Sequence, residues 1–260
     1  LGLSVDWRRE FTTNDERYSK FITWQYRTLK ERGLLEKGLH PVKYCTNEDN
    51  PVTTHDLLEG EEAEFQEYTL VRFEGEDGAI LPMATLRPET VRGVTNAYVD
   101  PDGDYVRATV DGERWVVSRQ AVQKLELQDH EIGGDSELSG ADLVGERVTN
   151  PITGDEVLVL PASFVDTDNA TGVVMSVPAH SPDDYIALQE AKERADEMAE
   201  YGIDPEAVRA IESVPILTVE GYGEVPARDA VEEYDISSQE DPALEEATQE
   251  LYNREFHQGR

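Results

Sequence analysis

The chain has 260 residues, enough for one large domain or two small ones with a hydrophobic core. Apolar residues make up 38% of it, and no stretch approaches the ~20 consecutive apolar residues of a membrane span, which excludes an integral membrane helix. Acidic residues outnumber basic ones by 56 to 23, for a formal net charge of −33. Such a chain repels itself unless salt screens it.

The acidic residues are spread along the whole chain, whereas a site for a basic partner would be a patch. We therefore expect a protein adapted to a high-salt cytoplasm, most stable at molar salt and with a shallow salt dependence of activity. Cys45 is the only cysteine, which excludes an internal disulfide and predicts a reducing compartment. A small buried apolar residue is the default interpretation of Cys45.

The N-terminal region predicts a helix followed by irregular chain. The start, Leu1–Asp6, has no basic lead and no apolar core, so we expect an internal edge of a longer protein and no targeting segment. Thr13-Asn14-Asp15-Glu16 matches a capping box, and apolar residues follow at helical spacing as far as Leu29, before Gly33. From 38 to 67 the chain is acidic and predicts no regular structure.

The middle of the chain predicts strands. Asp111-Gly112 between two alternating segments is a two-residue hairpin signal. Pro82 predicts that its segment is an edge or bulged strand. The candidate strands are 68–73, 79–85, 94–99, 105–110, 113–118, 157–160 and 172–177. Many short strands suggest a barrel-like sheet.

Helices return near the end of the chain. Residues 183–201 have a helical pattern that closes on Gly202, and Asp241-Pro242 predicts the start of a last helix carrying Leu244, Ala247 and Leu251. The sequence thus predicts an α/β protein with a barrel-like β-rich body, surrounding helices and helical arms at both ends.

Two segments carry a recognisable pattern, Ala84-Thr-Leu-Arg-Pro-Glu-Thr-Val-Arg-Gly-Val-Thr95 and Ala170-Thr-Gly-Val-Val-Met-Ser-Val-Pro-Ala-His-Ser-Pro-Asp-Asp-Tyr185. Together they resemble the threonine-rich region and the glycine- and aspartate-containing region of leucyl-tRNA synthetase editing domains, in the archaeal and eukaryotic form. The flanks 5–11 and 255–257 resemble the junctions with the synthetase body. The sequence departs from the family pattern at Ala170, where a glycine is usual, and at Arg92, Ser181 and Asp183.

The resemblance implies hydrolysis of the aminoacyl ester of mischarged tRNA(Leu), a post-transfer editing reaction. It implies a junction at 1–40, an editing domain at 41–225 and a helical return at 226–260. The expected partners are the 3′ end of tRNA(Leu) carrying a non-cognate amino acid and the remainder of the synthetase; neither a membrane nor a cofactor is expected. The His-Ile-Gly-His and Lys-Met-Ser-Lys-Ser signatures of amino-acid activation are absent, so this chain alone should not activate an amino acid.

Three residues are the predicted catalytic group. Asp184 lies at a predicted helix start, which should keep it ionised, and an anionic carboxylate suits the substrate's α-ammonium; the alternative is a plain helix cap. Thr85 and Thr90 flank Arg87-Pro88, and proline restricts Arg87 to extended geometry, so both hydroxyls can face one pocket. The resemblance makes Thr90 the gate that rejects leucine and gives Thr85 the ester or the attacking water. The alternative is a pair of surface threonines on a strand edge.

The remaining site predictions concern substrate binding. Met175 and Val177 share one strand face with Val173 and would line a side-chain pocket, or else pack in the core. His180 would orient the ribose or a water, or be structural, and Arg87 would contact phosphate or ribose. The predicted substrate-binding residues are Leu86, Arg87, Met175, Val177, His180 and Ser181.

We expect no metal, although His180, Asp183 and Asp184 could imitate a ligand cluster. The sequence has no nucleophile elbow, zinc-binding His-Glu-x-x-His pair or phosphate loop. The expected mechanism orients substrate and water, uses backbone N–H groups for the oxyanion and the substrate's own hydroxyl, and identifies no general base. The open alternatives are an inactive tRNA-binding insertion, a metal-dependent hydrolase, and a valyl or isoleucyl editing domain.

Overall fold

The computed structural model describes residues 6, 8, 10–38, 42–45, 47–53 and 67–259. The chain forms two compact units, residues 1–65 and 66–260, which we treat separately. Parts of the predicted N-terminal junction, at Val5, Trp7 and Arg9, lie outside the described residues, as do 39–41 and 54–66 of the predicted irregular segment.

The described residues of the first unit form one helix and one small hairpin. Helix α1 (Glu16–Glu31) begins at Asp15, whose carboxylate accepts the backbone N–H of Tyr18 at 2.7 Å. The predicted capping box is therefore wrong by two residues, because Asp15 and not Thr13 supplies the capping oxygen. Strands β1 (Lys43–Cys45) and β2 (Asn50–Val52) pair antiparallel where irregular chain was predicted. Cys45 is only half-buried there, contrary to the expectation of a buried thiol.

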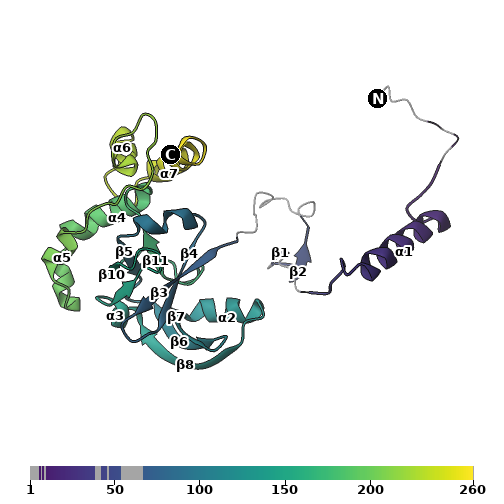
Figure 1. The fold of residues 1–260 in the computed structure, drawn as a ribbon, viewed down its shortest axis with the longest axis horizontal. Coiled ribbons are helices and arrows are strands. Elements are labelled where there is room, and N and C mark those ends of the chain that lie inside the picture. Colours follow the sequence, from purple (N-terminus) through teal and green to yellow (C-terminus); the bar gives the residue numbers. More distant parts are fainter. Residues whose placement is uncertain are drawn as a thin grey trace. The chain divides into compact units, whose positions relative to one another are not determined.

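The second unit is built on one nine-stranded sheet, with the order β11-β5-β10-β9-β3-β4-β7-β6-β8. The β10–β5 and β4–β7 pairs are parallel and the other pairs antiparallel. The α/β class is confirmed, although the sheet is not closed into a barrel; β11 at one edge lies against β4, so the sheet curls on itself (Figure 1). The strands are β3 (Thr69–Gly75), β4 (Ile80–Thr85), β5 (Asn96–Val99), β6 (Asp104–Val110), β7 (Glu113–Ser118), β8 (Ile132–Ser139), β9 (Arg147–Thr149), β10 (Glu156–Pro161) and β11 (Val174–Ser176).

Two strand predictions have opposite outcomes. The β6–β7 hairpin forms as predicted, with positive φ at both Asp111 (50°) and Gly112 (86°), as a type I′ turn requires. The prediction that Pro82 marks an edge strand is wrong, because β4 lies between β3 and β7. The N–H of Gly75 bonds to the C=O of Ala79, and in an antiparallel pair every second residue points its N–H and C=O toward the partner strand. Pro82 is three residues after Ala79, so its nitrogen points away from β3 and toward β7. The β4–β7 ladder has a single bridge, at Ile80, so the missing N–H costs no ladder bond.

Helices gather at both ends of the sheet. Helix α2 packs on β6 and β7, while α4, α6 and α7 pack on one another (Figure 1). The helix predicted over 183–201 is interrupted at Arg194 and resumes as the 3-10 helix η3, which ends at Gly202 with φ 76° as expected. The elements are α2 (Arg119–Leu127), α3 (Gly140–Leu143), α4 (Pro182–Glu193), α5 (Pro205–Arg209), α6 (Pro226–Glu233), α7 (Ala243–Gln258), η2 (Pro88–Gly93) and η3 (Glu197–Tyr201).

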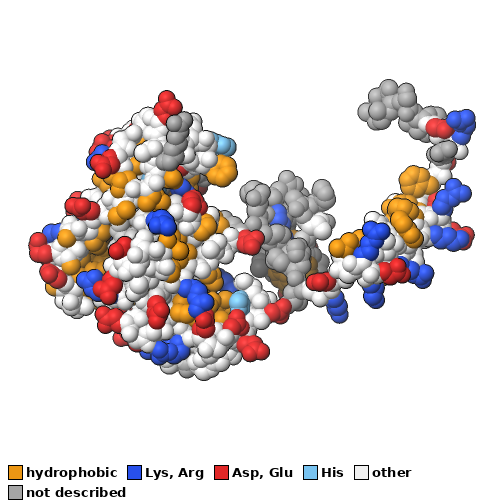
Figure 2. All heavy atoms as spheres, viewed as in Figure 1, with side chains coloured by type: hydrophobic (Ala, Val, Ile, Leu, Met, Phe, Trp, Pro, Cys, Tyr) orange, Lys and Arg blue, Asp and Glu red, His pale blue; other side chains and the backbone are white. Residues whose placement is uncertain are grey.

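The last helix starts one residue later than predicted, although Asp241 still accepts the N–H of Ala243 at 3.0 Å. The apolar residues of α7 pack with those of α4 and α6 as their spacing predicted. None of the helices in the described part of the chain is long and apolar enough to cross a membrane. On the face visible in Figure 2, acidic side chains are scattered over the whole second unit and do not form one patch.

Candidate functional site

The turn after β4 is held by two threonine hydroxyls. Thr85 Oγ1 accepts the backbone N–H of Arg87 at 2.9 Å, and Thr90 Oγ1 donates to the carbonyl of Arg87 at 2.8 Å. Both threonines are buried, and Arg87 before Pro88 has φ −127° and ψ 67°, which is non-helical but not the extended geometry that was predicted. The structure therefore brings the two hydroxyls to one peptide. A hydroxyl has one donor and two acceptor positions, so Thr85 keeps its hydrogen and Thr90 keeps lone pairs for a ligand.

Asp184 lies in the first turn of α4, which Ser181 caps by accepting the N–H of Asp184 at 3.3 Å. The carboxylate of Asp184 accepts the backbone N–H of Val177 at 2.8 Å. Burial, reinforced by the charge of Asp183, raises the pKa of Asp184 to about 7, against the opposing bonds from Val177 and Ser181. The expectation that the helix start keeps Asp184 ionised is therefore wrong in the free protein: desolvation outweighs the helix N-terminus, and near neutral pH the carboxylate is only partly ionised.

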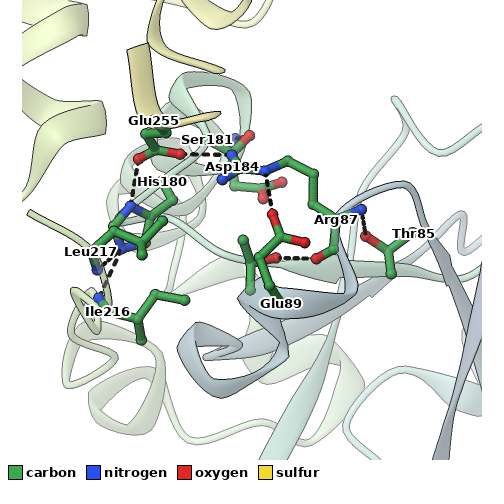
Figure 3. Close-up of polar contacts among 10 residues, drawn as sticks. Thr85, Arg87, Glu89, His180, Ser181, Asp184, Ile216, Leu217 and Glu255 are labelled. Atoms are coloured by element: carbon green, nitrogen blue, oxygen red, sulfur yellow. Dashed lines mark hydrogen bonds and ion pairs between the residues drawn. The ribbon is translucent and has the colours of Figure 1, made fainter. Parts of the chain in front are cut away.

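The guanidinium of Arg87 is fixed by three groups, and Figure 3 shows two of them, Glu255 and Glu89. Nη1 lies 2.7 Å from Glu255 Oε2, Nε lies 3.1 Å from Glu89 Oε1, and the ring of Tyr252 lies 4.6 Å beneath the guanidinium carbon. Burial, and then the charge of Asp184, raises the pKa of Tyr252 to about 12 against a hydrogen bond with Ser181, so this phenol is neutral. It stacks on Arg87 and bonds to the serine that caps the helix of Asp184. Arg87 and Asp184, from segments distant in sequence, thus meet around one tyrosine of α7.

Tyr252 and Glu255 contact Arg87 but were not predicted as site residues. Glu255 was interpreted as part of a junction, yet it is buried, while the adjacent Phe256 is 85% exposed. A signal was present: Glu255 follows Leu251 by four positions and continues the apolar stripe of α7. A carboxylate on the buried face of a helix needs a partner, and here the partners are Arg87 and His180.

In the free protein His180 has a structural role, which was the alternative to a substrate contact. Its side chain is 1% exposed, Nδ1 lies 2.6 Å from Glu255 Oε1, and Nε2 accepts the backbone N–H groups of Ile216 at 2.8 Å and Leu217 at 3.4 Å. Because Nε2 accepts, Nδ1 carries the hydrogen and the ring is neutral. Both nitrogens are occupied, so none is left for a ribose or a water.

The other predicted substrate contacts divide into core and surface. Met175 and Val177 are buried in the main hydrophobic core, so the core-packing alternative describes their side chains; Val177 acts on the site through its backbone N–H. Ser181 is buried and caps α4, whereas Leu86 is 55% exposed beside the threonine turn. Of the predicted set, Thr85, Thr90, Arg87 and Asp184 form the polar centre.

The candidate metal ligands do not converge. His180 uses both nitrogens within the protein, and the carboxylate of Asp183 accepts the hydroxyl of Thr248 at 2.5 Å. In the part of the chain that the structure describes, no group of three His, Cys, Asp or Glu side chains could hold a metal ion.

Comparison with known proteins decides the family. The family model described as "Leucyl-tRNA synthetase, editing domain" matches residues 67–197. The chain belongs to the leucyl-tRNA synthetase editing domain family. The resemblance carried by the two sequence segments is thereby confirmed. The nine-stranded sheet, the threonine turn and Asp184 all lie within the matched range.

Archaeal leucine–tRNA ligases are similar over the whole chain. The enzyme of Methanosarcina mazei is 51% identical over 263 residues, covering 100% of this chain and 27% of the relative. That of Methanopyrus kandleri is 53% identical, covering 100% of this chain and 28% of the relative. The chain therefore spans little more than a quarter of the length of these relatives.

Solved editing domains share the fold. The crystal structure of GlLeuRS-CP1 superposes with a TM-score of 0.66 at 29% identity, over 74% of this chain and 86% of that one. The cytosolic leucyl-tRNA synthetase editing domain of P. knowlesi gives a TM-score of 0.66 at 21% identity, over 75% and 85% of the two chains. The second likeness is a likeness of fold alone.

Proposed function

We propose that this editing domain hydrolyses the aminoacyl ester of mischarged tRNA(Leu), releasing the non-cognate amino acid and the intact tRNA. The observation that carries the proposal is the meeting of Asp184, Arg87 and the Thr85–Thr90 turn around Tyr252. An aminoacyl ester offers an α-ammonium, a carbonyl, a side chain and a ribose hydroxyl, and this cluster has a group suited to each.

Asp184 binds the α-ammonium in this proposal. With a pKa of about 7, the carboxyl is poised between its neutral and charged forms in the free protein. A cation at hydrogen-bonding distance favours the charged form, so substrate binding lowers the pKa of Asp184 and releases a proton. The site thus avoids holding a fully charged, desolvated carboxylate when no substrate is present.

In this proposal Thr90 excludes the leucine side chain, and Thr85 orients the ester or the attacking water. Thr90, pinned to the Arg87 carbonyl, forms a rigid wall against the branched side chain of leucine. A rigid wall suits an editing site, because an apolar pocket separates substrates one methylene apart by only ~1–3 kcal/mol and a second, excluding site must reject the correct product. Thr85 keeps its hydroxyl hydrogen for the ester or the water.

Arg87 contacts a ribose oxygen and not a phosphate. Two carboxylates, Glu255 and Glu89, offset its charge, so the guanidinium acts as a fixed set of donors and has little net attraction for an anion. The two ion pairs use Nε–H and one Nη1–H of its five N–H groups, and the others can donate to a sugar hydroxyl.

The reaction we propose needs no metal. A water oxygen attacks the ester carbonyl carbon, backbone N–H groups stabilise the oxyanion, and the bond to the ribose oxygen breaks as that oxygen takes the proton that the attacking water loses. The vicinal ribose hydroxyl assists this proton transfer. We further propose that residues 1–40 and 226–260 connect the editing body at 41–225 to the remainder of the synthetase in a high-salt cytoplasm, and that α7 of the second connection also supplies Tyr252 and Glu255 to the site.

A deacylation panel tests the function. The chain is incubated with leucyl-tRNA(Leu) and with tRNA(Leu) carrying smaller or isosteric amino acids, with and without a chelator. The proposal expects hydrolysis of the mischarged species above the spontaneous rate, little hydrolysis of leucyl-tRNA(Leu), and no effect of the chelator. Loss of activity on chelation points to the metal-dependent alternative. Equal, spontaneous rates for every species, in the chain alone and in a longer synthetase that contains it, contradict the proposal.

A further inference from the structure

Glu255 is a buried carboxylate whose two oxygens serve two different segments. Oε2 lies 2.7 Å from Nη1 of Arg87, and Oε1 lies 2.6 Å from Nδ1 of His180 (Figure 3). Its side chain has no exposed surface, whereas that of Arg87 is 20% exposed. The pair is therefore buried at the α7 end and open at the Arg87 end.

Of the two partners of Glu255, only Arg87 carries a positive charge. His180 is neutral, because its Nε2 accepts two backbone N–H groups, so it contributes a hydrogen bond and no positive charge. Arg87 is the cation that offsets the buried carboxylate. Such a pair adds little net stability over apolar packing, but it fixes the geometry of both side chains. Removing one partner destabilises the protein, because the other charge is left buried and unpaired.

Helix α7 controls the side chain of Arg87 while the threonine turn controls its backbone. Glu255 and Tyr252 are three residues apart on one face of α7 and contact the guanidinium from its edge and its face. Through His180, the same carboxylate also holds the loop before α4, which leads into Ser181 and Asp184. Glu255 therefore touches the supports of both halves of the site.

We propose that Glu255 is a positioning residue for ester hydrolysis, which orients Arg87 and, through His180, the segment that carries Asp184. The inference rests on the proposed editing function. Docking of α7 then assembles the site, and a carboxylate is required because one oxygen accepts the Nδ1–H of His180 while the other forms the ion pair with Arg87. Glutamine has a single acceptor oxygen and cannot serve Arg87 and the Nδ1–H of His180 together.

The test is a double-mutant cycle on the rate of deacylation. Glu255→Gln should lower kcat/KM for a mischarged tRNA(Leu) by about 10- to 100-fold, mostly in kcat, because misplaced orienting groups affect the reacting geometry more than binding. In an Arg87→Gln background the same change should cost less than about 3-fold, because the one oxygen of glutamine can still accept the Nδ1–H of His180 and the partner it cannot serve, Arg87, is already absent. Glu250→Gln is the matched control: Glu250 also lies on α7 and pairs with Tyr234 and Arg254, away from Arg87. It should leave kcat/KM within about 3-fold of the parent.

Each outcome separates the inference from the proposed function. An inactive parent chain contradicts the editing function itself. With an active parent, a Glu255→Gln rate near that of the parent, or an equal loss with and without Arg87, overturns the positioning role. So does an equal loss in Glu250→Gln, which would show that α7 matters only for the fold. If Glu255→Gln does not fold, the cycle is run with Glu255→Asp, which keeps the charge and withdraws it by one methylene; the same non-additivity with Arg87→Gln is expected, and additivity overturns the proposal.

Discussion

Asp184→Asn should make the protein more stable, and more so at high pH. The carboxyl of Asp184 has a pKa of about 7 in the folded protein against 3.8 as a model value. In the pH range between these values the unfolded chain loses the proton and the folded protein keeps it, so the free energy of unfolding falls as pH rises. Asparagine has no charge to desolvate, and its side-chain oxygen can still accept the N–H of Val177.

The size of the effect follows from the pKa difference. The gap between 3.8 and about 7 corresponds to an upper bound of about 4 kcal/mol at about 1.36 kcal/mol per pKa unit. Asp184 keeps some solvent-accessible surface, so screening reduces the expected gain to roughly 1–3 kcal/mol at about pH 8. At about pH 5, where the folded protein is still protonated, less than half of that gain remains.

Equilibrium unfolding in urea measures this gain, with ~1 M KCl present to screen the net charge. Asp204→Asn is the control, because Asp204 is an exposed helix cap on α5 and asparagine caps a helix as well as aspartate does. It should change the free energy of unfolding little at either pH. An Asp184→Asn variant that is no more stable than the parent at about pH 8, or that gains equally at both pH values, would refute the desolvation argument.

Three further predictions follow. Deacylation by the parent should fall as pH drops below about 7, because the ammonium needs ionised Asp184, and a pH profile of kcat/KM that is flat from about 5 to 8 would contradict this. Thr90→Ala should let leucyl-tRNA(Leu) be hydrolysed, while Thr90→Val, which keeps the bulk and loses the bond to the Arg87 carbonyl, should still spare it; equal behaviour of the two places the gate elsewhere. Ala170→Gly should raise the free energy of unfolding by about 0.5–1 kcal/mol, because Ala170 adopts φ 48°. Gly172→Ala should lower the free energy of unfolding by about 2 kcal/mol or more, because a Cβ there would lie 2.6 Å from Ser118 Cβ. Urea titration measures both changes.

Local chemistry explains which features the sequence predicted. Pro88 keeps Arg87 non-helical, although its ψ of 67° is not the extended geometry that was predicted. The hairpin at Asp111-Gly112 and the helix stop at Gly202 depend on neighbouring residues, and the structure has both. The proximity of the two threonine hydroxyls is of the same kind, because the intervening turn is short.

Tertiary packing explains the features that the sequence did not predict. The raised pKa of Asp184 comes from burial, which no local pattern encodes. His180 is occupied by Glu255, 75 residues further along the chain, and by two backbone N–H groups of an unrelated segment. Pro82 sits inside the sheet because a distant strand pairs with β4 at only one bridge. Such long-range partners become visible only in the folded chain.

The central claim is that the Asp184 carboxylate holds the substrate's α-ammonium, and blocking that ammonium tests it most directly. Hydrolysis of a mischarged tRNA(Leu) is measured before and after N-acetylation of its amino acid, with the parent and with Asp184→Asn. The account predicts that acetylation protects the ester from the parent about as strongly as the Asp184→Asn substitution does, and that acetylation has no further effect on the variant. Efficient hydrolysis of the acetylated ester by the parent, or equal protection in parent and variant, would contradict it.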